Sequence, residues 1–236
     1  MRNRLIVAGG ACVAVVALAG AGAYVYFFSG LRSSPSALGL SAATPSAAAS
    51  IGSLAGKWTV ASGSVAGYRV NELFVGQTSK HAAVARTSTV SGSVTVTGDA
   101  SSYQVNGITI TAVLTNLHSV DSVAGRDVSQ RDGFVARSMN LQKFPNATFT
   151  ASSVTVVASS AGQPVDLSLP GTLTIHGVTK NVTATARAQQ NSGNVEVAGS
   201  VTIDMTDYGV TPPSVPFTTV DSQVTIEFDI FLTKSG

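Results

Sequence analysis

Cysteine, histidine and charged residues are all scarce in this 236-residue chain. The single cysteine, Cys12, excludes an intramolecular disulfide and any metal site built from several thiolates. Only 11% of the residues are charged and 44% are hydrophobic, which leaves ample apolar material for a core and argues against a largely disordered chain. The lack of disulfides does not exclude export, because a large β core is stable without them.

Motifs that carry catalysis are also missing. The three histidines, His81, His118 and His176, lie far apart in the sequence, and none belongs to a recognised metal-binding motif. There is no Gly-x-Ser-x-Gly nucleophile motif, and no glycine-rich phosphate loop stands between a strand and a helix. We therefore expect a binding protein rather than an enzyme, with no catalytic residues, no metal ligands and no cofactor.

The net charge of +2 gives no sign of a nucleic-acid partner. Arg2, Arg4 and Arg32 flank an N-terminal apolar segment, and the chain beyond Arg32 has 11 basic against 12 acidic residues. No cluster of basic residues is interleaved with aromatic residues, as nucleic-acid-binding surfaces require.

The N-terminal segment predicts a membrane anchor over residues 1–30. Residues 5–28 contain no charge, and such a helix is long enough to cross a hydrocarbon core of about 30 Å. Arg2 and Arg4 precede this run, so the positive-inside rule places the rest of the chain outside the cytoplasm. A cleavable signal peptide is the alternative, but the apolar run continues beyond both of its small-x-small sites, at residues 17–19 and 21–23.

Residues 31–53 are rich in Ser, Ala and Pro and weakly periodic, which predicts a flexible linker. Residues 54–236 then form one domain in which strand follows strand. The alternation is clearest near the C-terminus, where Val224, Ile226 and Phe228 face one way and Thr225 and Glu227 the other. Strands are predicted over residues 58–60, 64–70, 82–97 with a bend at Gly92, 103–114, 148–157, 165–175, 178–188, 195–205 and 224–233.

One segment, residues 117–145, interrupts this pattern with a high density of charge, and residues 134–141 could form one or two helical turns before Pro145. Eight or nine long strands bury their apolar faces either as a two-sheet sandwich or as a closed barrel. A barrel of about eight strands encloses room for side chains or one slender ligand. Long strands would make that room a tube suited to an elongated apolar molecule.

The stretch from Leu173 to Thr183 reads as a hairpin turning at His176 and Gly177. Its Leu-Thr-Ile-His-Gly-Val-Thr-Lys-x-Val pattern resembles the characteristic hairpin of the YceI-like family, extracytoplasmic β-barrels that bind polyisoprenoid-type lipids. Other segments resemble the same family in the same order: Trp58 with residues 67–72, Arg131-Asp132 leading to residues 144–149, residues 205–213, and the closing strand at 224–228.

The resemblance implies an all-β fold, an extended antiparallel eight-stranded lipocalin-like barrel with a short helical segment, here preceded by one transmembrane helix. It implies a protein that holds an isoprenoid or other long-chain lipid, polyprenyl or quinone-like, in the barrel lumen. The N-terminal apolar run, in turn, predicts a single-pass protein of the cell membrane. Tyr68, Arg69 and Arg131 are the expected head-group partners. The full set of expected ligand-binding residues is Tyr68, Arg69, Arg131, Phe134, Phe144, Phe149, Ile175, His176 and Phe217.

Six of these nine residues have a plainer interpretation. The phenylalanines could fill a core, His176 could be a turn residue, and Arg131-Asp132 could be a structural ion pair. The whole domain could be a structural or adhesive surface module with its interior filled by side chains, or, less favoured, an enzyme using the cavity. Small inward residues favour the binding protein. A homodimer is left open.

Overall fold

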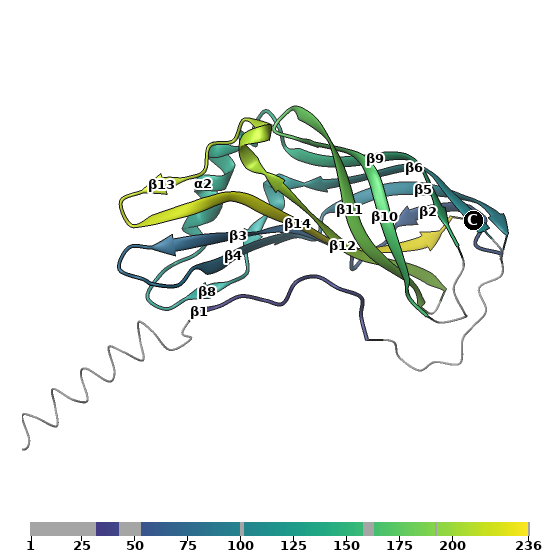
Figure 1. Ribbon diagram of the computed structural model, residues 1–236, viewed down its shortest axis with the longest axis horizontal. Coiled ribbons are helices and arrows are strands. Elements are labelled where there is room, and N and C mark those ends of the chain that lie inside the picture. The colour runs from purple at the N-terminus through teal and green to yellow at the C-terminus, as the bar shows by residue number, and fades with distance from the viewer. Residues whose placement is uncertain (1–31, 43–52, 100–101, 158–162, 192, 236) are drawn as a thin grey trace, which may run out of the picture.

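The computed structural model describes residues 32–42, 53–99, 102–157, 163–191 and 193–235. Within these residues the chain is mostly β-strand, with one α-helix and two short 3-10 helices (Figure 1). The strands are β1 Arg32–Ser33, β2 Gly56–Val60, β3 Val65–Phe74, β4 His81–Thr87, β5 Val90–Asp99, β6 Ser102–Val113, β7 His118–Ser119, β8 Ser122–Val123, β9 Asn146–Val156, β10 Val165–Ile175, β11 Val178–Asn191, β12 Asn194–Asp204, β13 Ser214–Val215 and β14 Thr218–Lys234. The helices are η1 Leu114–Asn116, α2 Gln130–Ser138 and η2 Met205–Tyr208.

Eight strands close into an antiparallel barrel, as predicted. Hydrogen bonds link β2, β5, β6, β9, β10, β11, β12 and β14 in that order, and β14 pairs with β2 to close the ring. Strand β3 continues the line of β2 along β14, and β4 pairs with β3 as β5 pairs with β2. These paired extensions lengthen the barrel at one end. Because the pairings of β14 with β12 and with β2 close the strands into a ring, the barrel is the correct alternative and the sandwich is wrong.

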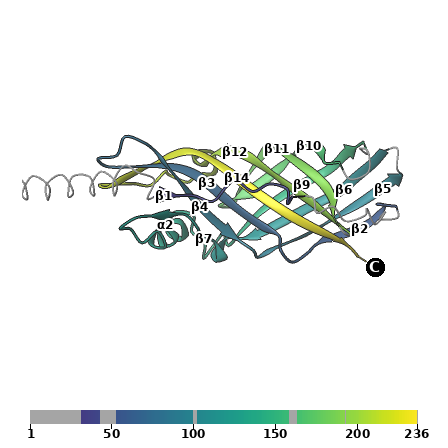
Figure 2. The same cartoon turned by 90° about the horizontal axis from the view of Figure 1, so that it is seen from below.

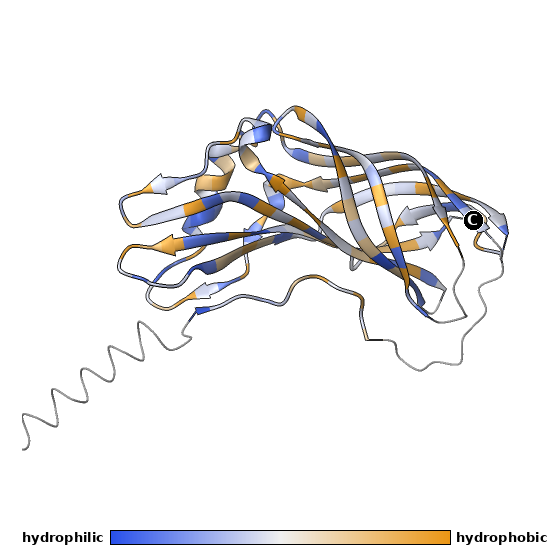
Figure 3. Cartoon of the chain, viewed as in Figure 1, coloured by the Kyte–Doolittle hydropathy of each residue, from blue (hydrophilic) through white to orange (hydrophobic). Residues whose placement is uncertain are grey.

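The alternation in β14 sets the inner and outer faces of the barrel. Ile226, Phe228 and Ile230 face the interior, whereas Glu227 and Asp229 lie on the outside, as the sequence pattern predicts. Figure 3 shows the same mixture of hydrophobic and hydrophilic residues along the barrel strands. Each strand therefore contributes one apolar row to the lumen.

The strand predicted over residues 82–97 is instead two strands, β4 and β5, separated at Ser88 and Thr89. The Thr87 hydroxyl accepts a hydrogen bond from the Thr89 N–H at 3.1 Å, and such side-chain contacts compete with strand pairing. At Gly92, where a bend is predicted, φ is 150° and a Cβ would collide with the Thr109 carbonyl oxygen, and the pairing of β5 with β6 shifts register just beyond it, between Ser93 and Thr95.

The helix predicted over residues 134–141 begins earlier, and α2 spans Gln130–Ser138. Asp127 accepts hydrogen bonds from the N–H and the hydroxyl of Ser129, at 3.0 and 2.6 Å, which forms a turn leading into the helix. The helix ends before Asn140, whose φ of 47° is incompatible with a continuing α-helix. Figure 2 places α2 at the end of the barrel opposite the C-terminus.

The hairpin predicted around His176 and Gly177 is confirmed. Ile175 pairs with Val178, which leaves a two-residue turn between β10 and β11. His176 and Gly177 have φ of 53° and 75°, the combination of a type I′ turn, whose twist matches that of the flanking strands.

Residues 32–42, named the strap from here on, run along the outside of the barrel (Figure 1). At one end β1 pairs with β8, and farther along the strap the N–H groups of Leu38 and Ser41 donate to Glu227 and Glu196 at 3.2 and 2.6 Å. The flexible linker predicted over residues 31–53 does not describe these residues, because two buried carboxylates of the barrel hold them. Residues 31 and 43–52 lie outside the described part of the chain.

The predicted anchor, residues 1–30, also lies outside the described residues. Among the residues that are described, no helix combines the length and the apolar character needed to cross a bilayer. The anchor and the division into anchor, linker and barrel domain therefore stay predictions.

Candidate functional site

The barrel lumen contains two adjoining cavities. One, of about 310 Å³, lies toward the end of the barrel that carries the C-terminus, and the other, of about 460 Å³, lies toward α2. Ala66, Ala112, Ala147 and Ile226 line both cavities. Three of these four shared residues are alanines, so the region where the two cavities adjoin, named the waist, is lined largely by small side chains.

The smaller cavity, named the inner cavity, is almost entirely apolar. Its walls include the buried residues Trp58, Val94 and Ile108. Among the described residues, the only ones with polar side chain atoms that line it are Trp58, Tyr103 and glutamines. The Trp58 indole N–H donates to the Leu54 carbonyl at 2.8 Å, so this polar atom is satisfied outside the ligand space. Among the residues that the structure describes, none with a charged side chain lines the inner cavity, which suits a hydrocarbon chain and no charged ligand group.

The larger cavity, named the outer cavity, has an apolar wall and one charged corner. In β3 the period-2 alternation points Tyr68, Val70 and Glu72 to the lumen, and α2 brings Arg131 opposite them. Helix α2 is held in place by Asp132, which accepts from the N–H and hydroxyl of Ser119 in β7 at 3.0 and 2.7 Å. The helix and β3 therefore position the charged corner jointly.

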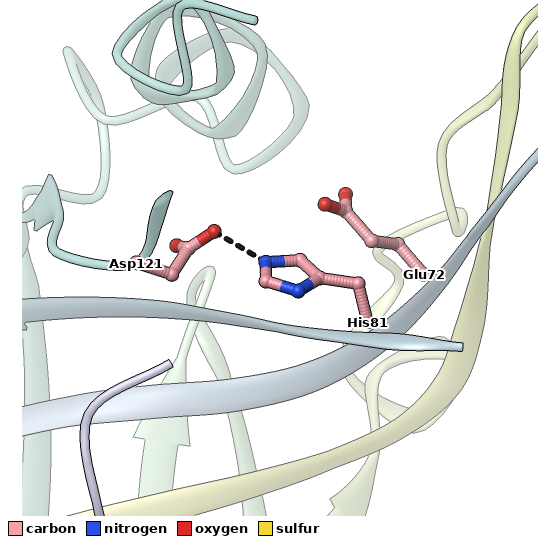
Figure 4. Close-up of side chains that lie close together, drawn as sticks. All are labelled: Glu72, His81 and Asp121. Carbon is pink, nitrogen blue, oxygen red and sulfur yellow. Dashed lines mark hydrogen bonds and ion pairs between the residues drawn. The ribbon is translucent and has the colours of Figure 1, made fainter. Parts of the chain in front are cut away.

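The charged corner is a network of four side chains, of which Glu72, His81 and Asp121 are buried (Figure 4) and Arg131 is partly exposed. Arg131 donates from its two terminal nitrogens to the Asp121 carboxylate at 2.8 and 3.2 Å, and also donates to Glu72 at 2.6 Å. The His81 Nε2–H donates to Asp121 at 2.7 Å, and the Val84 N–H donates to the other oxygen of that carboxylate at 3.0 Å. The network is internally hydrogen-bonded, and the Arg131 guanidinium still borders the cavity.

Charge in this network fixes the protonation of its members. Burial acts to raise the pKa of Asp121, but hydrogen bonds from His81 and Arg131 outweigh it and lower that pKa to about 2. Burial raises the pKa of the nearby Tyr68 phenol well above its ordinary value. At neutral pH the corner therefore presents an ionised Asp121, a charged Arg131 and a neutral phenol able to donate a hydrogen bond.

Glu72, His81 and Asp121 also meet the geometry of a cation site, since their ligand atoms all lie within 4.8 Å of one another. However, the Arg131 guanidinium pairs with both carboxylates of this group, at 2.6 and 2.8 Å. The cluster thus already contains the positive charge that a metal ion would supply, and we assign no metal to it.

The open end of the outer cavity carries aromatic rings and a second arginine that the sequence analysis does not single out. The Arg126 guanidinium lies 4.4 Å from the centre of the Phe74 ring and 5.7 Å from that of Phe217. Phe134 and Phe217 line the same cavity and remain partly exposed. They come from separate places in the sequence, since Arg126 and Phe217 lie in loops, Phe134 lies on α2 and Phe74 ends β3, so no regular sequence period brings them together.

The structure divides the nine predicted site residues into two groups. Six of them line the cavities: Tyr68, Arg131, Phe134, Ile175 and Phe217 the outer cavity, and Phe149 the inner cavity. Arg69, Phe144 and His176 line neither cavity. Whether the six bind a ligand stays a prediction.

Phe144 and His176 lie together at the β10–β11 turn. Their rings are 5.1 Å apart in an edge-to-face arrangement, and the His176 Nδ1–H donates to the Tyr208 carbonyl at 3.0 Å. His176 therefore has the structural role of a turn residue, and this placement gives no support to an enzyme built on it.

Arg69 is directed outward and holds the strap. It lies 3.6 Å from Glu227 and donates to the Pro35 carbonyl at 2.8 Å. Arg86 on β4 completes the arrangement, because it donates to Glu227 at 3.0 Å and to the Ser36 carbonyl at 2.6 Å. Two arginines, one carboxylate and the strap backbone thus form one network, named the clamp, on the outside of the barrel.

A family model described as the YceI-like domain matches residues 58–232 of the chain. No curated protein matches the chain.

Similar solved structures include a polyisoprenoid binding domain from Saccharophagus degradans implicated in plant cell wall breakdown. It is 16% identical, with a TM-score of 0.52, over 75% of this chain and 98% of that one. Burkholderia cenocepacia BcnA is 18% identical over 70% and 95% of the two chains, with a TM-score of 0.46. A Campylobacter jejuni YCEI protein is 16% identical over 61% and 81%, with a TM-score of 0.39. At these identities the likeness is one of fold.

Proposed function

The chain belongs to the YceI-like family, and on that premise we propose that it is a membrane-tethered, extracytoplasmic lipid-binding protein. Its ligand is an isoprenoid-type chain, of the polyprenyl or quinone kind, held in the barrel lumen. The observation that carries the proposal is the lumen itself, two adjoining apolar cavities that meet at a waist lined largely by alanine. The Saccharophagus degradans domain of the same fold is a polyisoprenoid binding domain, which supports this ligand class.

The two cavities suggest how such a ligand would lie. The hydrocarbon tail occupies the inner cavity, where no charged side chain lines the wall, and the head group lies near Tyr68 and Arg131 in the outer cavity. Each CH2 group moved from water into this space contributes about 0.8 kcal/mol, so a long chain binds without many polar contacts. The neutral Tyr68 phenol is the available hydrogen-bond donor for a polar head. Arg131 contributes its positive charge nearby, because its terminal nitrogens already donate to Glu72, Asp121 and Ser119.

The direct test is native mass spectrometry of a chain comprising residues 32–236, purified from a lipid-rich host, followed by organic extraction. This chain keeps the strap, whose contacts bury Glu227 and Glu196. We expect a discrete prenyl-type adduct. An empty protein that also fails to take up polyprenols or quinones would refute the proposal.

A matched pair of variants localises the ligand. Ala184 lines the inner cavity and is buried, whereas the next residue, Thr185, is exposed on the outer face of β11. We expect Ala184→Phe to fill the lumen and reduce lipid uptake at least tenfold, and Thr185→Phe to leave uptake unchanged. Equal uptake by both variants would mean that the lipid is bound elsewhere.

The structural or adhesive module is the second candidate function, and it requires an interior filled by side chains. Cavities of about 310 and 460 Å³ are the observation against it. The homodimer stays a prediction that sedimentation of the same chain would test.

A further inference from the structure

We propose that the open end of the outer cavity docks onto the surface of an anionic phospholipid bilayer, so that the lumen opens toward the membrane. The docking surface, named the rim, consists of Val75, Arg126, Phe134, Arg137 and Phe217. The transfer of lipid into the lumen rests on the proposed lipid-binding function, whereas the contact of the rim with the bilayer is a separate property.

Exposed apolar side chains gather on the rim. Among the described residues, four large hydrophobic side chains are exposed, and three of them, Val75 at 71%, Phe217 at 48% and Phe134 at 40%, belong to the rim. The Val75 N–H donates to the Phe217 carbonyl at 3.0 Å, so these two residues from different hairpins are neighbours. Apolar side chains gathered around the opening of an apolar cavity mark an interaction surface.

Arginines accompany these side chains in the way that membrane-surface proteins require. The Arg137 guanidinium lies 4.7 Å from the centre of the Phe134 ring, and Arg126 lies over Phe74 and near Phe217. Among the described residues, neither guanidinium has an ion-pair partner. An aromatic ring that enters the head-group layer together with an arginine that reaches phosphate is the arrangement that favours an anionic bilayer.

The path of the chain places the same end of the barrel near the predicted anchor. Arg32, the first described residue, donates to the carbonyl and the hydroxyl of Ser79 at 3.2 and 2.8 Å, and Ser79 belongs to the same β3–β4 connection as Val75. The uncharged run over residues 5–28 ends only a few residues earlier in the sequence. A bilayer that holds this run would therefore lie on the rim side, while the strap runs along the outside of the barrel away from the rim (Figure 1).

These observations fit a lipid that passes from the bilayer into the lumen without crossing water.

Val157 provides a matched control for the rim, because it is 67% exposed and follows β9 at the inner-cavity end. Val75 and Val157 do not line either cavity, so changes there leave the ligand space intact.

The first experiment measures which end of the barrel meets the membrane. The full-length chain, carrying Cys12→Ser and one new cysteine labelled with an environment-sensitive fluorophore, is reconstituted into phosphatidylcholine–phosphatidylglycerol vesicles that contain nitroxide-labelled lipid. We expect quenching with the label in Val75→Cys to exceed that in Val157→Cys several-fold. Equal or weaker quenching at residue 75 would overturn the proposal.

The second experiment separates docking from lipid binding. Val75→Asp places a negative charge on the rim, and Val157→Asp places the same charge at the far end. We expect Val75→Asp to slow transfer of geranylgeraniol from phosphatidylglycerol-containing vesicles to the full-length chain about tenfold, and Val157→Asp to change it less than twofold. Uptake from cyclodextrin is expected to be unchanged in both.

The outcomes distinguish the two proposals. Equal transfer rates for the two aspartate variants would refute docking at the rim. A chain whose residue 75 is quenched but which takes up no geranylgeraniol even from cyclodextrin would support docking and refute the proposed lipid-binding function.

Discussion

Replacing Glu227 by glutamine should release the strap from the barrel. The Glu227 side chain is only 1% exposed, and its carboxylate accepts from Arg86 at 3.0 and 3.3 Å and from the Leu38 N–H at 3.2 Å, with Arg69 at 3.6 Å. A glutamine keeps the shape but loses the charge, and its amide NH2 faces groups that are themselves donors.

The expected loss follows from these contacts. A hydrogen bond to a charged group contributes roughly 1.5–3 kcal/mol and a neutral one roughly 0.5–1.5, so weakening the two Arg86 bonds costs about 2 kcal/mol. The donor that is left without an acceptor adds to this cost. The Arg69 and Arg86 side chains are 22% and 19% exposed, so water partly compensates them, and the loss stays at the lower end of the cost of about 3–5 kcal/mol for breaking a buried pair. We expect the free energy of unfolding to fall by about 3 kcal/mol.

Thermal unfolding followed by circular dichroism checks this value on the chain of residues 32–236. For a chain of this length about 3 kcal/mol corresponds to a fall of roughly 6–12 °C in the midpoint. The control is Asp166→Asn, which removes a pair with Arg187 in which Asp166 is 90% exposed, and which should leave the midpoint unchanged.

A second background shows whether the strap is responsible. In a chain beginning at residue 53 the strap is absent, Glu227 is hydrated, and Glu227→Gln should cost at least 1 kcal/mol less than in the longer chain. An equal loss in both backgrounds would mean that Glu227 stabilises the barrel itself, and no loss in either would refute the reasoning about the clamp.

Three further changes test other parts of the structure. Burial and the neighbouring Glu196 raise the pKa of Asp229 from 3.8 to about 6, so the folded chain binds this proton more tightly than the unfolded chain. The resulting stabilisation is complete below pH 4 and is lost as the pH rises through 6. The thermal unfolding midpoints at pH 5 and pH 7.5 should therefore differ less in Asp229→Asn than in the unchanged chain. Asp121→Asn should lower the free energy of unfolding in urea by about 3 kcal/mol, since Arg131 loses its bidentate partner; a change below 1 kcal/mol would contradict this. Gly177→Ala should lower the thermal unfolding midpoint of the protein more than Gly76→Ala does. Both residues have positive φ, but only a Cβ at residue 177 would meet the Phe144 ring, at 2.5 Å. Equal falls in the midpoint would exclude the clash.

Adjacent strand residues show what the sequence could have predicted more sharply. Tyr68 and Arg69 are both expected at the head group from the resemblance, but neighbours in a strand face opposite sides, and only Tyr68 lines the lumen. Ile175, the last residue of β10, lines the outer cavity, whereas His176 follows it in the turn, where its positive φ takes it out of the strand alternation. The apolar parity of β3 was enough to place Tyr68 inside.

Other features had no signal in the sequence. Glu227 alternates with apolar residues in β14 as any solvent-facing residue would, yet it is buried because a segment 189 residues earlier in the chain covers it. Arg126 lies in an irregular loop, and its position over Phe74 depends on how that loop closes over the barrel end. Contacts between segments this far apart, and in no regular period, depend on the assembled fold.

The sequence by itself determined the all-β fold, the strand alternation, the β10–β11 hairpin and the apolar character of the lumen, because these depend on local backbone preference and on a period of two residues. Tertiary structure alone decided that the lumen contains cavities and that Glu72, Asp121 and Arg131 meet in one corner. It also decided that the strap is held by the two arginines and the carboxylate of the clamp. Each of these requires side chains from separate strands, loops or α2 to arrive at one place, and that arrangement is set by the register and closure of the barrel.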